Sequence, residues 1–253
     1  MAYLENRFVI SQLTRRELKR KYARSRLGIV WSVLAPLLSM VVLSLIFSQL
    51  FKRSIENYPI YYLSGYLIWQ ALTGATTSAM TALVDNRALL LKIKFPMEIF
   101  LVTRVYTAFI NLLYSLVAYA LMLLVFRIPL SFALLAAPLL FLFVFVFSLG
   151  LSYMLATAYV FFGDVKHLYS VFLTLWMYVS AIFYPAEQLS GFIYEVIRVN
   201  PVYQYIHALR TLVLGASLPG ASAWLYMLAW SLAAYRGGRA LFNRYRARIM
   251  QKL

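Results

Sequence analysis

Long uncharged apolar stretches constrain this chain more than any other feature of its sequence. Runs of 18 or more residues without a charged side chain recur along it, and about 20 such residues cross the ~30 Å hydrocarbon core of a bilayer as a helix. Only 13% of the residues are charged, against about 25% in soluble domains. Because a soluble helical protein needs charged faces on most of its helices, the sequence predicts an all-α polytopic membrane protein.

Six transmembrane helices are predicted within a single transmembrane domain over residues 29–240. The uncharged run that ends before Asp164 is 36 residues long, too long for one upright helix at ~1.5 Å per residue. Pro129 and Pro138 are expected to break its front, and Arg236 interrupts the last span. The predicted spans are roughly 29–51, 60–83, 97–126, 137–162, 167–185 and 221–240.

Basic residues predict the orientation of these spans, because they collect on the cytoplasmic side of membrane proteins. They are concentrated in the N-terminal segment 1–28, the loops after the second and fourth spans, and the tail 241–253. Both termini are therefore expected in the cytoplasm. The same rule accounts for the net charge of +16, and no nucleic-acid reader motif is present. The N-terminal segment lacks the apolar core of a signal peptide.

The segment 186–220, between the fifth and sixth spans, is too apolar for an ordinary loop and too interrupted to span. Asn200-Pro201 and Gly215 are natural break points. We expect short re-entrant helices in the outer leaflet, since irregular backbone at that depth must be covered by protein or line a water-filled cavity. An amphipathic surface helix is the alternative.

The sequence lacks the residues that several functional classes normally require. None of the eight acidic residues falls in the middle of a span, where proton- or sodium-driven transporters place theirs. The two histidines, His167 and His207, fall on opposite sides of the membrane, there is no cysteine, and no metal-ligand spacing occurs. A secondary transporter and a membrane enzyme are thus the weaker alternatives. The sequence also holds no phosphate-binding loop, so ATP could act only through another chain.

Three motifs occur in order along the chain. They are "RRELKRKYARSRLGIVWSVLAPL" (15–37), "NRALLLKIKFP" (86–96), and "GDVKHLYSVFLTLWMYVSAIFYP" (163–185) followed by "NPVYQYIHALR" (200–210). Together they resemble type-2 ATP-binding-cassette exporter permeases of the polysaccharide, O-antigen and teichoic acid export family. Gly163 stands where that family often has Arg or Lys, and Ser180-Ala181 where it often has Ser/Thr-Pro. The resemblance covers nearly the whole chain.

The resemblance implies a homodimer of six-helix subunits in the bacterial cytoplasmic (inner) membrane, working with two copies of an ABC ATPase subunit. Such a permease is not an enzyme by itself and binds no cofactor; the partner binds ATP and Mg. The implied substrate is a lipid-linked, undecaprenyl-type polysaccharide, which passes between the two permeases in contact with membrane lipid. A type-2 permease for a drug, lipid or other amphiphile is the alternative.

The resemblance also places a coupling helix in the loop 84–96 and an amphipathic interface helix in 1–28. In the loop an aliphatic ridge lies between basic flanks, which suits docking into a groove of the ATPase; Pro96 and Glu98 suit the start of the third span. A plain positive-inside loop and a polybasic membrane anchor are the alternatives. The predicted coupling residues are Arg87, Leu89, Leu90, Leu91, Lys92, Lys94 and Phe95, and those of the interface helix are Arg16, Lys19, Arg20 and Tyr22.

The resemblance implies that the fifth span, together with the first, lines the substrate path. Four aromatic residues lie within about 60° of arc on the fifth span, at ~100° per residue, and aromatic faces can stack on the C–H faces of sugars; ordinary helix packing is the alternative. Arg210 could meet a phosphate, or cap a helix or reach headgroups instead. The predicted channel residues are Tyr169, Phe172, Trp176, Phe183 and Trp31, and those of the channel exit are Tyr203, Tyr205, His207 and Arg210.

Overall fold

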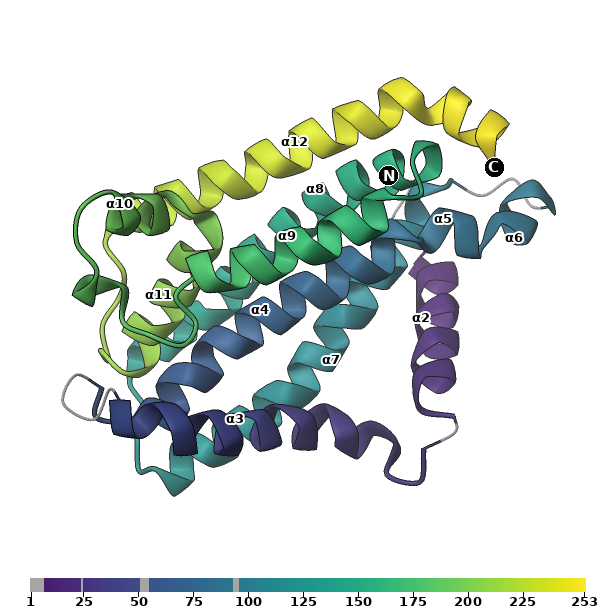
Figure 1. Ribbon diagram of the computed structural model, residues 1–253. Helices are drawn as coiled ribbons and strands as arrows, with labels where there is room; N and C mark the ends of the chain where they lie inside the picture. The colour runs from purple at the N-terminus through teal and green to yellow at the C-terminus, as the bar shows by residue number, and fades with distance from the viewer. Residues whose placement is uncertain (1–6, 24, 51–54, 93–95) are drawn as a thin grey trace.

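The computed structural model describes residues 7–23, 25–50, 55–92 and 96–253, and every regular element in these ranges is helical (Figure 1). The all-α prediction is therefore confirmed. The longer helices are α2 (Arg7–Tyr22), α3 (Trp31–Leu50), α4 (Tyr58–Met80), α7 (Glu98–Val125), α8 (Ala137–Phe161), α9 (Val165–Val179), α11 (Pro201–Val213) and α12 (Ala221–Lys252). The shorter ones are η1 (Gly28–Val30), α5 (Ala82–Asp85), α6 (Arg87–Lys92), η2 (Phe132–Ala136), η3 (Ala186–Gln188) and α10 (Phe192–Val199).

Three helical segments in the described part of the chain are long and apolar enough to cross a membrane: Gly28–Phe47, Glu98–Val125 and Phe132–Phe161. They correspond to the first, third and fourth predicted spans. α9 has 15 residues, about 22 Å at ~1.5 Å per residue, and α12 carries several arginines and continues past the predicted boundary at 240 to Lys252. That the remaining spans also cross a membrane stays a prediction.

The centre of the bundle is α4, which packs against α3, α7, α8, α9 and α11 (Figure 1). Leu63, Leu67, Ile68 and Leu72 are fully buried there. The serines and threonines of α4 do not need outside partners, because their hydroxyls donate to the carbonyl oxygen four residues earlier in the same helix. Thr76, for example, donates to the Leu72 carbonyl at 2.8 Å. The helix can therefore be rich in small polar residues and still lie in the core.

α8 and α12 make the closest helix pair, at Gly150 and Gly238. A methyl group built on Gly238 would overlap the Gly150 carbonyl oxygen, and one on Gly150 would overlap the backbone of Ala234 and Tyr235. Small residues allow such approach between helix backbones in membrane proteins. This contact holds the middle of the long α12 against α8.

The fifth predicted span ends earlier than expected, at Val179 instead of residue 185. Ala181 has a left-handed backbone (φ 48°), which ends a helix. The prediction missed this end because the apolar sequence continues to Pro185 without a break in character. The chain then forms η3, α10 and α11, which lie at the opposite end of the bundle from α5, α6 and the C-terminus (Figure 1).

Candidate functional site

The predicted coupling loop forms two short helices, α5 and α6, that meet at Asn86. The Asn86 backbone carbonyl accepts hydrogen bonds from the amides of Leu89 and Leu90, both at 3.0 Å, and so begins α6. Its side-chain amide donates to the Ala82 carbonyl at 2.8 Å. Its side-chain oxygen accepts from Arg16 of α2 at 3.0 Å. Asn86 therefore fixes the angle between α5 and α6 and ties both to α2.

The aliphatic ridge predicted for this loop is divided by the structure. Leu91 is 57% exposed, whereas Leu90 is only 5% exposed and belongs to a buried cluster with Met97 and Phe100. Leu89 is half-buried against the same cluster. The prediction that Leu90 contacts a partner does not fit this structure, because the short helix needs an anchor and Leu90 provides it.

The basic flanks of α6 are exposed in the part of the helix that the structure describes. Arg87 and Lys92 are exposed on either side of Leu91. Lys94 and Phe95, which were also predicted to contact a partner, lie outside the described residues. The exposed residues of α6 in the described part of the chain are thus Arg87, Ala88, Leu91 and Lys92.

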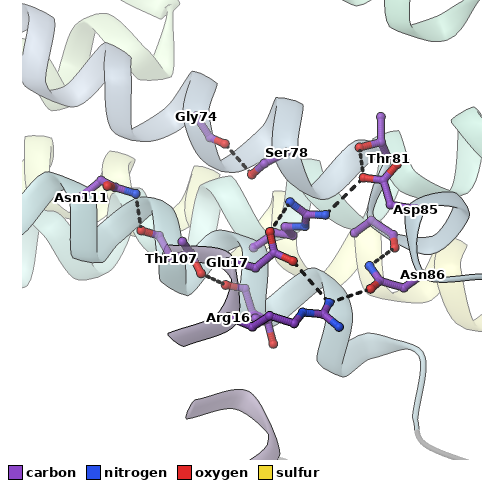
Figure 2. Close-up of polar contacts among 12 residues, drawn as sticks. Arg16, Glu17, Gly74, Ser78, Thr81, Asp85, Asn86, Thr107 and Asn111 are labelled. Atoms are coloured by element: carbon purple, nitrogen blue, oxygen red, sulfur yellow. Dashed lines mark hydrogen bonds and ion pairs between the residues drawn. The ribbon is translucent and has the colours of Figure 1, made fainter. Parts of the chain in front are cut away.

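An arginine within α7 joins three elements next to this loop. Arg104 donates to Glu17 of α2 at 2.8 Å and to Asp85 of α5 at 3.2 Å. Figure 2 shows Arg16, Glu17, Asp85 and Asn86 converging at this place. The side chains of Arg104 and Glu17 are mostly covered, at 17% and 10% exposed. Pairs shielded in this way are screened by salt much less than surface pairs.

The four predicted interface-helix residues of α2 take different positions. Arg16 binds Asn86, as described above. The Tyr22 hydroxyl donates to the Asn111 side chain of α7 at 2.7 Å. Arg20 lines a polar cavity of about 660 Å³ between α2, α4 and α7, and Lys19 lines a second, apolar cavity on another side of α2. α2 is therefore held to the bundle by its middle and by its C-terminal end.

Of the predicted channel residues, three on α9 form an aromatic row. The ring centroids of Tyr169 and Phe172 are 6.2 Å apart, and those of Phe172 and Trp176 are 5.0 Å apart. The Tyr169 hydroxyl donates to Thr76 at 2.7 Å and the Trp176 indole to Asn200 at 3.0 Å. Phe172 makes no such bond and is 49% exposed. It is the ring of this row that a substrate could reach.

The other two predicted channel residues lie away from this row. Phe183 follows the end of α9, and its ring stacks with those of Tyr62 and Phe47. Trp31 is the first residue of α3 and is 44% exposed. In the described part of the chain, the ring contacts of Phe183 are with Phe47, Tyr62 and Tyr178, which do not belong to the row.

Of the predicted exit residues, His207 is exposed, whereas Tyr203, Tyr205 and Arg210 are buried. Tyr203 and His207 lie near each other and near Glu187, whose carboxylate accepts from the Tyr203 hydroxyl at 3.2 Å. Desolvation lowers the pKa of His207 from its ordinary 6.5, with a further lowering from Arg210 and an opposing effect of Glu187. Tyr205 is buried and shares a hydrogen bond of 2.7 Å with Ser231 of α12.

Arg210 is buried beneath the break that follows α9. Its guanidinium donates to the carbonyl oxygens of Tyr61, Ala181 and Ile182 at 3.2, 3.0 and 2.9 Å. It also lies 3.4 Å from the centroid of the Tyr61 ring, a cation–π geometry. In this conformation Arg210 satisfies irregular backbone and does not face the outside.

Sequence reasoning missed the residues that connect these elements: Glu17, Asn86, Arg104 and Asn200. Two signals were available. Glu17 is the single acid among the basic residues of 15–21, and Arg104 is an ionisable residue within a predicted span, where a specific partner is the rule. The role of Asn200 depends on its contacts with Trp176 and Ser180, which the sequence does not place together.

Comparison with known proteins gives a consistent result. The family model described as ABC-2 type transporter matches residues 9–214. The chain is 26% identical over 249 residues to the O-antigen export system permease protein RfbA of Myxococcus xanthus, covering 98% of this chain and 96% of the relative. It is 24% identical over 255 residues to a protein of the same name from Klebsiella pneumoniae, covering 100% and 97%. This chain belongs to the ABC-2 type transporter family, as a multi-pass membrane permease subunit.

Proposed function

We propose that this chain is the membrane subunit of an ATP-driven exporter that moves a lipid-linked polysaccharide out across the bacterial cytoplasmic membrane. The substrate class rests on the full-length similarity to permeases named for O-antigen export. In this proposal the chain crosses the membrane six times with both termini in the cytoplasm. It forms a homodimer and works with two separate ATPase subunits, which bind ATP and Mg.

The observation that carries the proposal is the construction of α6. A short helix exposes Leu91 between Arg87 and Lys92 at the end of the bundle that also holds the C-terminus. An exposed leucine flanked by cations suits a groove with an acidic rim on another protein. Its buried side is anchored by Leu90, and Asn86 and Arg104 connect its base to α2 and α7. A push on α6 would therefore reach the start of a membrane helix.

The homodimer is supported by the faces that the single chain leaves uncovered. Leu45 of α3 and Leu168 and Leu175 of α9 are more than 60% exposed. Lipid can cover such a face, and so can a second copy of the chain. The aromatic row of α9 borders this surface, which is the proposed position of the sugar path.

The test is a reconstitution of the purified permease with its co-expressed ATPase in vesicles. We expect ATP hydrolysis that needs both chains and is stimulated several-fold by a polyprenyl diphosphate-linked oligosaccharide. Stimulation by amphiphilic drugs or phospholipid, with none by the glycan, would identify a different cargo. Hydrolysis or transport by this chain without an ATPase would overturn the proposal.

A further inference from the structure

A second cavity, distinct from the polar one, lies on the other side of α2. It occupies about 940 Å³ between α2, η1 and α7. Its walls are mainly apolar, with Leu18 from α2, Ile29 from η1, and Val102, Tyr106 and Ile110 from α7. A cavity of this size and composition is within the range of small-ligand sites.

The α7 wall has the depth of one membrane leaflet. Val102, Tyr106 and Ile110 are spaced four residues apart, so they lie on one face of the helix. Ile110 is about 18 Å along α7 from its first residue, Glu98, at ~1.5 Å per residue. This is a little more than half of the ~30 Å hydrocarbon core. An acyl chain entering beside α2 would run along this wall to its end.

Two cations of α2 line the same cavity. Arg15 and Lys19 lie four residues apart on one side of the helix, and within the described ranges neither has a carboxylate at ion-pair distance. The neighbouring Arg16, in contrast, is bound to Glu17 and Asn86. A phosphate group is the partner that an arginine and a lysine at an apolar opening are suited to bind.

Thr14 is an independent feature of the same cavity. Its side chain lines the cavity, yet its hydroxyl is buried and has no hydrogen-bond partner among the described residues. Helical threonines ordinarily donate to the carbonyl four residues earlier, as Thr73 and Thr76 do. A buried hydroxyl without a partner is costly, and rotation of the Thr14 side chain toward the cavity would let it donate to an ester or phosphate oxygen.

We propose that this cavity is a binding site for an anionic phospholipid of the cytoplasmic leaflet. The phosphate lies between Arg15 and Lys19, and an acyl chain lies against Val102, Tyr106 and Ile110. The assignment to the cytoplasmic leaflet rests on the proposed orientation, but the site itself does not depend on export. Bound lipid would hold α2 in place from the side opposite its Arg104 contact.

The test uses the full-length permease in neutral detergent, with phosphatidylglycerol and phosphatidylcholine of identical acyl chains as probes. Retained lipid is counted by native mass spectrometry, and thermal unfolding is followed in parallel. We expect phosphatidylglycerol to be retained at one or more molecules per chain and to raise Tm by several degrees more than phosphatidylcholine. Equal effects of the two lipids would overturn the proposal.

Three variants locate the effect. Arg15→Gln with Lys19→Gln should weaken phosphatidylglycerol binding at least fivefold. Arg20→Gln with Lys21→Gln removes the same charge from α2 beside the polar cavity and should leave binding within twofold. Ile110→Trp, which fills the deep end and keeps every charge, should also reduce retention. An equal loss in both charge variants would mean general attraction to α2, and would refute a site.

A polyprenyl phosphate has a phosphate group and a long hydrocarbon chain, as the phospholipid does. It is therefore tested as a competing ligand in a separate experiment. If undecaprenyl phosphate displaces phosphatidylglycerol at a tenfold lower concentration, the cavity belongs to the carrier of the substrate and the phospholipid assignment is wrong. Displacement only at similar or higher concentration supports the phospholipid. Because none of these measurements involves ATP or transport, their outcome is independent of the proposed export activity.

Discussion

Arg104 of α7 donates to Glu17 of α2 at 2.8 Å while its other terminal nitrogen donates to Asp85 of α5 at 3.2 Å. One side chain thus connects the N-terminal helix, the base of the loop that carries α6, and a membrane helix. Removing one member of a shielded ion pair leaves the other charge unpaired in a low-dielectric place. The network is therefore a point where the position of α6 and that of α2 depend on each other.

The first prediction concerns this network. Arg104→Gln should lower the free energy of unfolding by about 2 kcal/mol, since Glu17 loses its charged partner. It should also weaken the link between ATP hydrolysis and transport, so that transport falls more than hydrolysis in the reconstituted complex. Thermal unfolding, ATPase rate and substrate export measured on one preparation check this.

A double-mutant cycle provides the control. Glu17→Gln combined with Arg104→Gln should cost less than the sum of the two single changes, because the pair is removed once. Arg236→Gln, at an arginine of α12 outside the network, should change neither stability nor the hydrolysis-to-transport ratio. Strict additivity of the two singles would show that the pair carries no coupling.

The second prediction separates two adjacent leucines of α6. Leu91→Asp should reduce co-purification of the ATPase at least tenfold while changing the free energy of unfolding by less than about 0.5 kcal/mol, because Leu91 is exposed. Leu90→Asp should cost about 3 kcal/mol or more, since it buries a carboxylate without a partner. Leu130→Asp, the same change at an exposed leucine far from α6, is the matched control and should do neither. Normal ATPase binding by Leu91→Asp would count against docking at α6.

The sequence predicts the elements of this molecule that depend on local interactions, and it fails where distant parts of the chain decide the structure. Helices such as α7 and α8 are fixed by long apolar runs with proline or charge at their ends, and both were predicted to within one residue. The end of α9 was not, because it depends on side chains from α4 and α11. Tyr58 and Tyr61 donate to the carbonyls of Phe183 and Tyr184.

The candidate site also combines features that the sequence predicts with features that only the packing of distant residues determines. That the loop 84–96 is basic and cytoplasmic is expected from composition, but which leucine faces outward is not. Leu90 and Leu91 are chemically identical, and only the packing of α6 on Met97 and Phe100 distinguishes them. Likewise, the sequence leaves three roles open for Arg210. The carbonyl oxygens that it binds belong to Tyr61 and Ile182, which are 149 and 28 positions away along the chain, so sequence alone could not choose among these roles.

The third prediction tests the α8–α12 contact. Gly238→Ala should destabilise the protein by about 2 kcal/mol, because the new methyl group meets the Gly150 backbone, which cannot move aside as a side chain can. Gly237→Ala is a matched control on the adjacent residue, where the methyl would meet only the end of Met154 at 3.3 Å. It should be neutral or slightly stabilising, as alanine favours helix over glycine by about 1 kcal/mol. Thermal unfolding of the two variants side by side decides the matter.

The fourth prediction concerns the buried arginine. Arg210→Met fills similar space but leaves the carbonyls of Tyr61, Ala181 and Ile182 without their donor, at about 1 kcal/mol or more for each. We expect lower thermal stability together with faster proteolysis within 180–200. Arg198→Met is the control, because Arg198 is exposed and its pair with Glu195 is 3.9 Å long, worth less than about 1 kcal/mol. Equal proteolysis rates in the two variants would contradict a clamping role for Arg210.

The fifth prediction addresses the aromatic row of α9. Trp176 is a poor probe of sugar contact, because its indole also bonds to Asn200 and its loss would disturb α11. Phe172 is half-exposed and has no such bond, so Phe172→Ala should reduce polysaccharide export severalfold and change the free energy of unfolding by less than about 1 kcal/mol. Phe172→Tyr, which keeps an aromatic face, should retain export, and Leu142→Ala, at an exposed leucine of α8, should leave export near its original level. If Phe172→Leu exports as well as the parent chain, an apolar surface suffices at this position and stacking on sugar is not needed. The export assay on assembled complexes, with ATPase content matched between variants, distinguishes these outcomes.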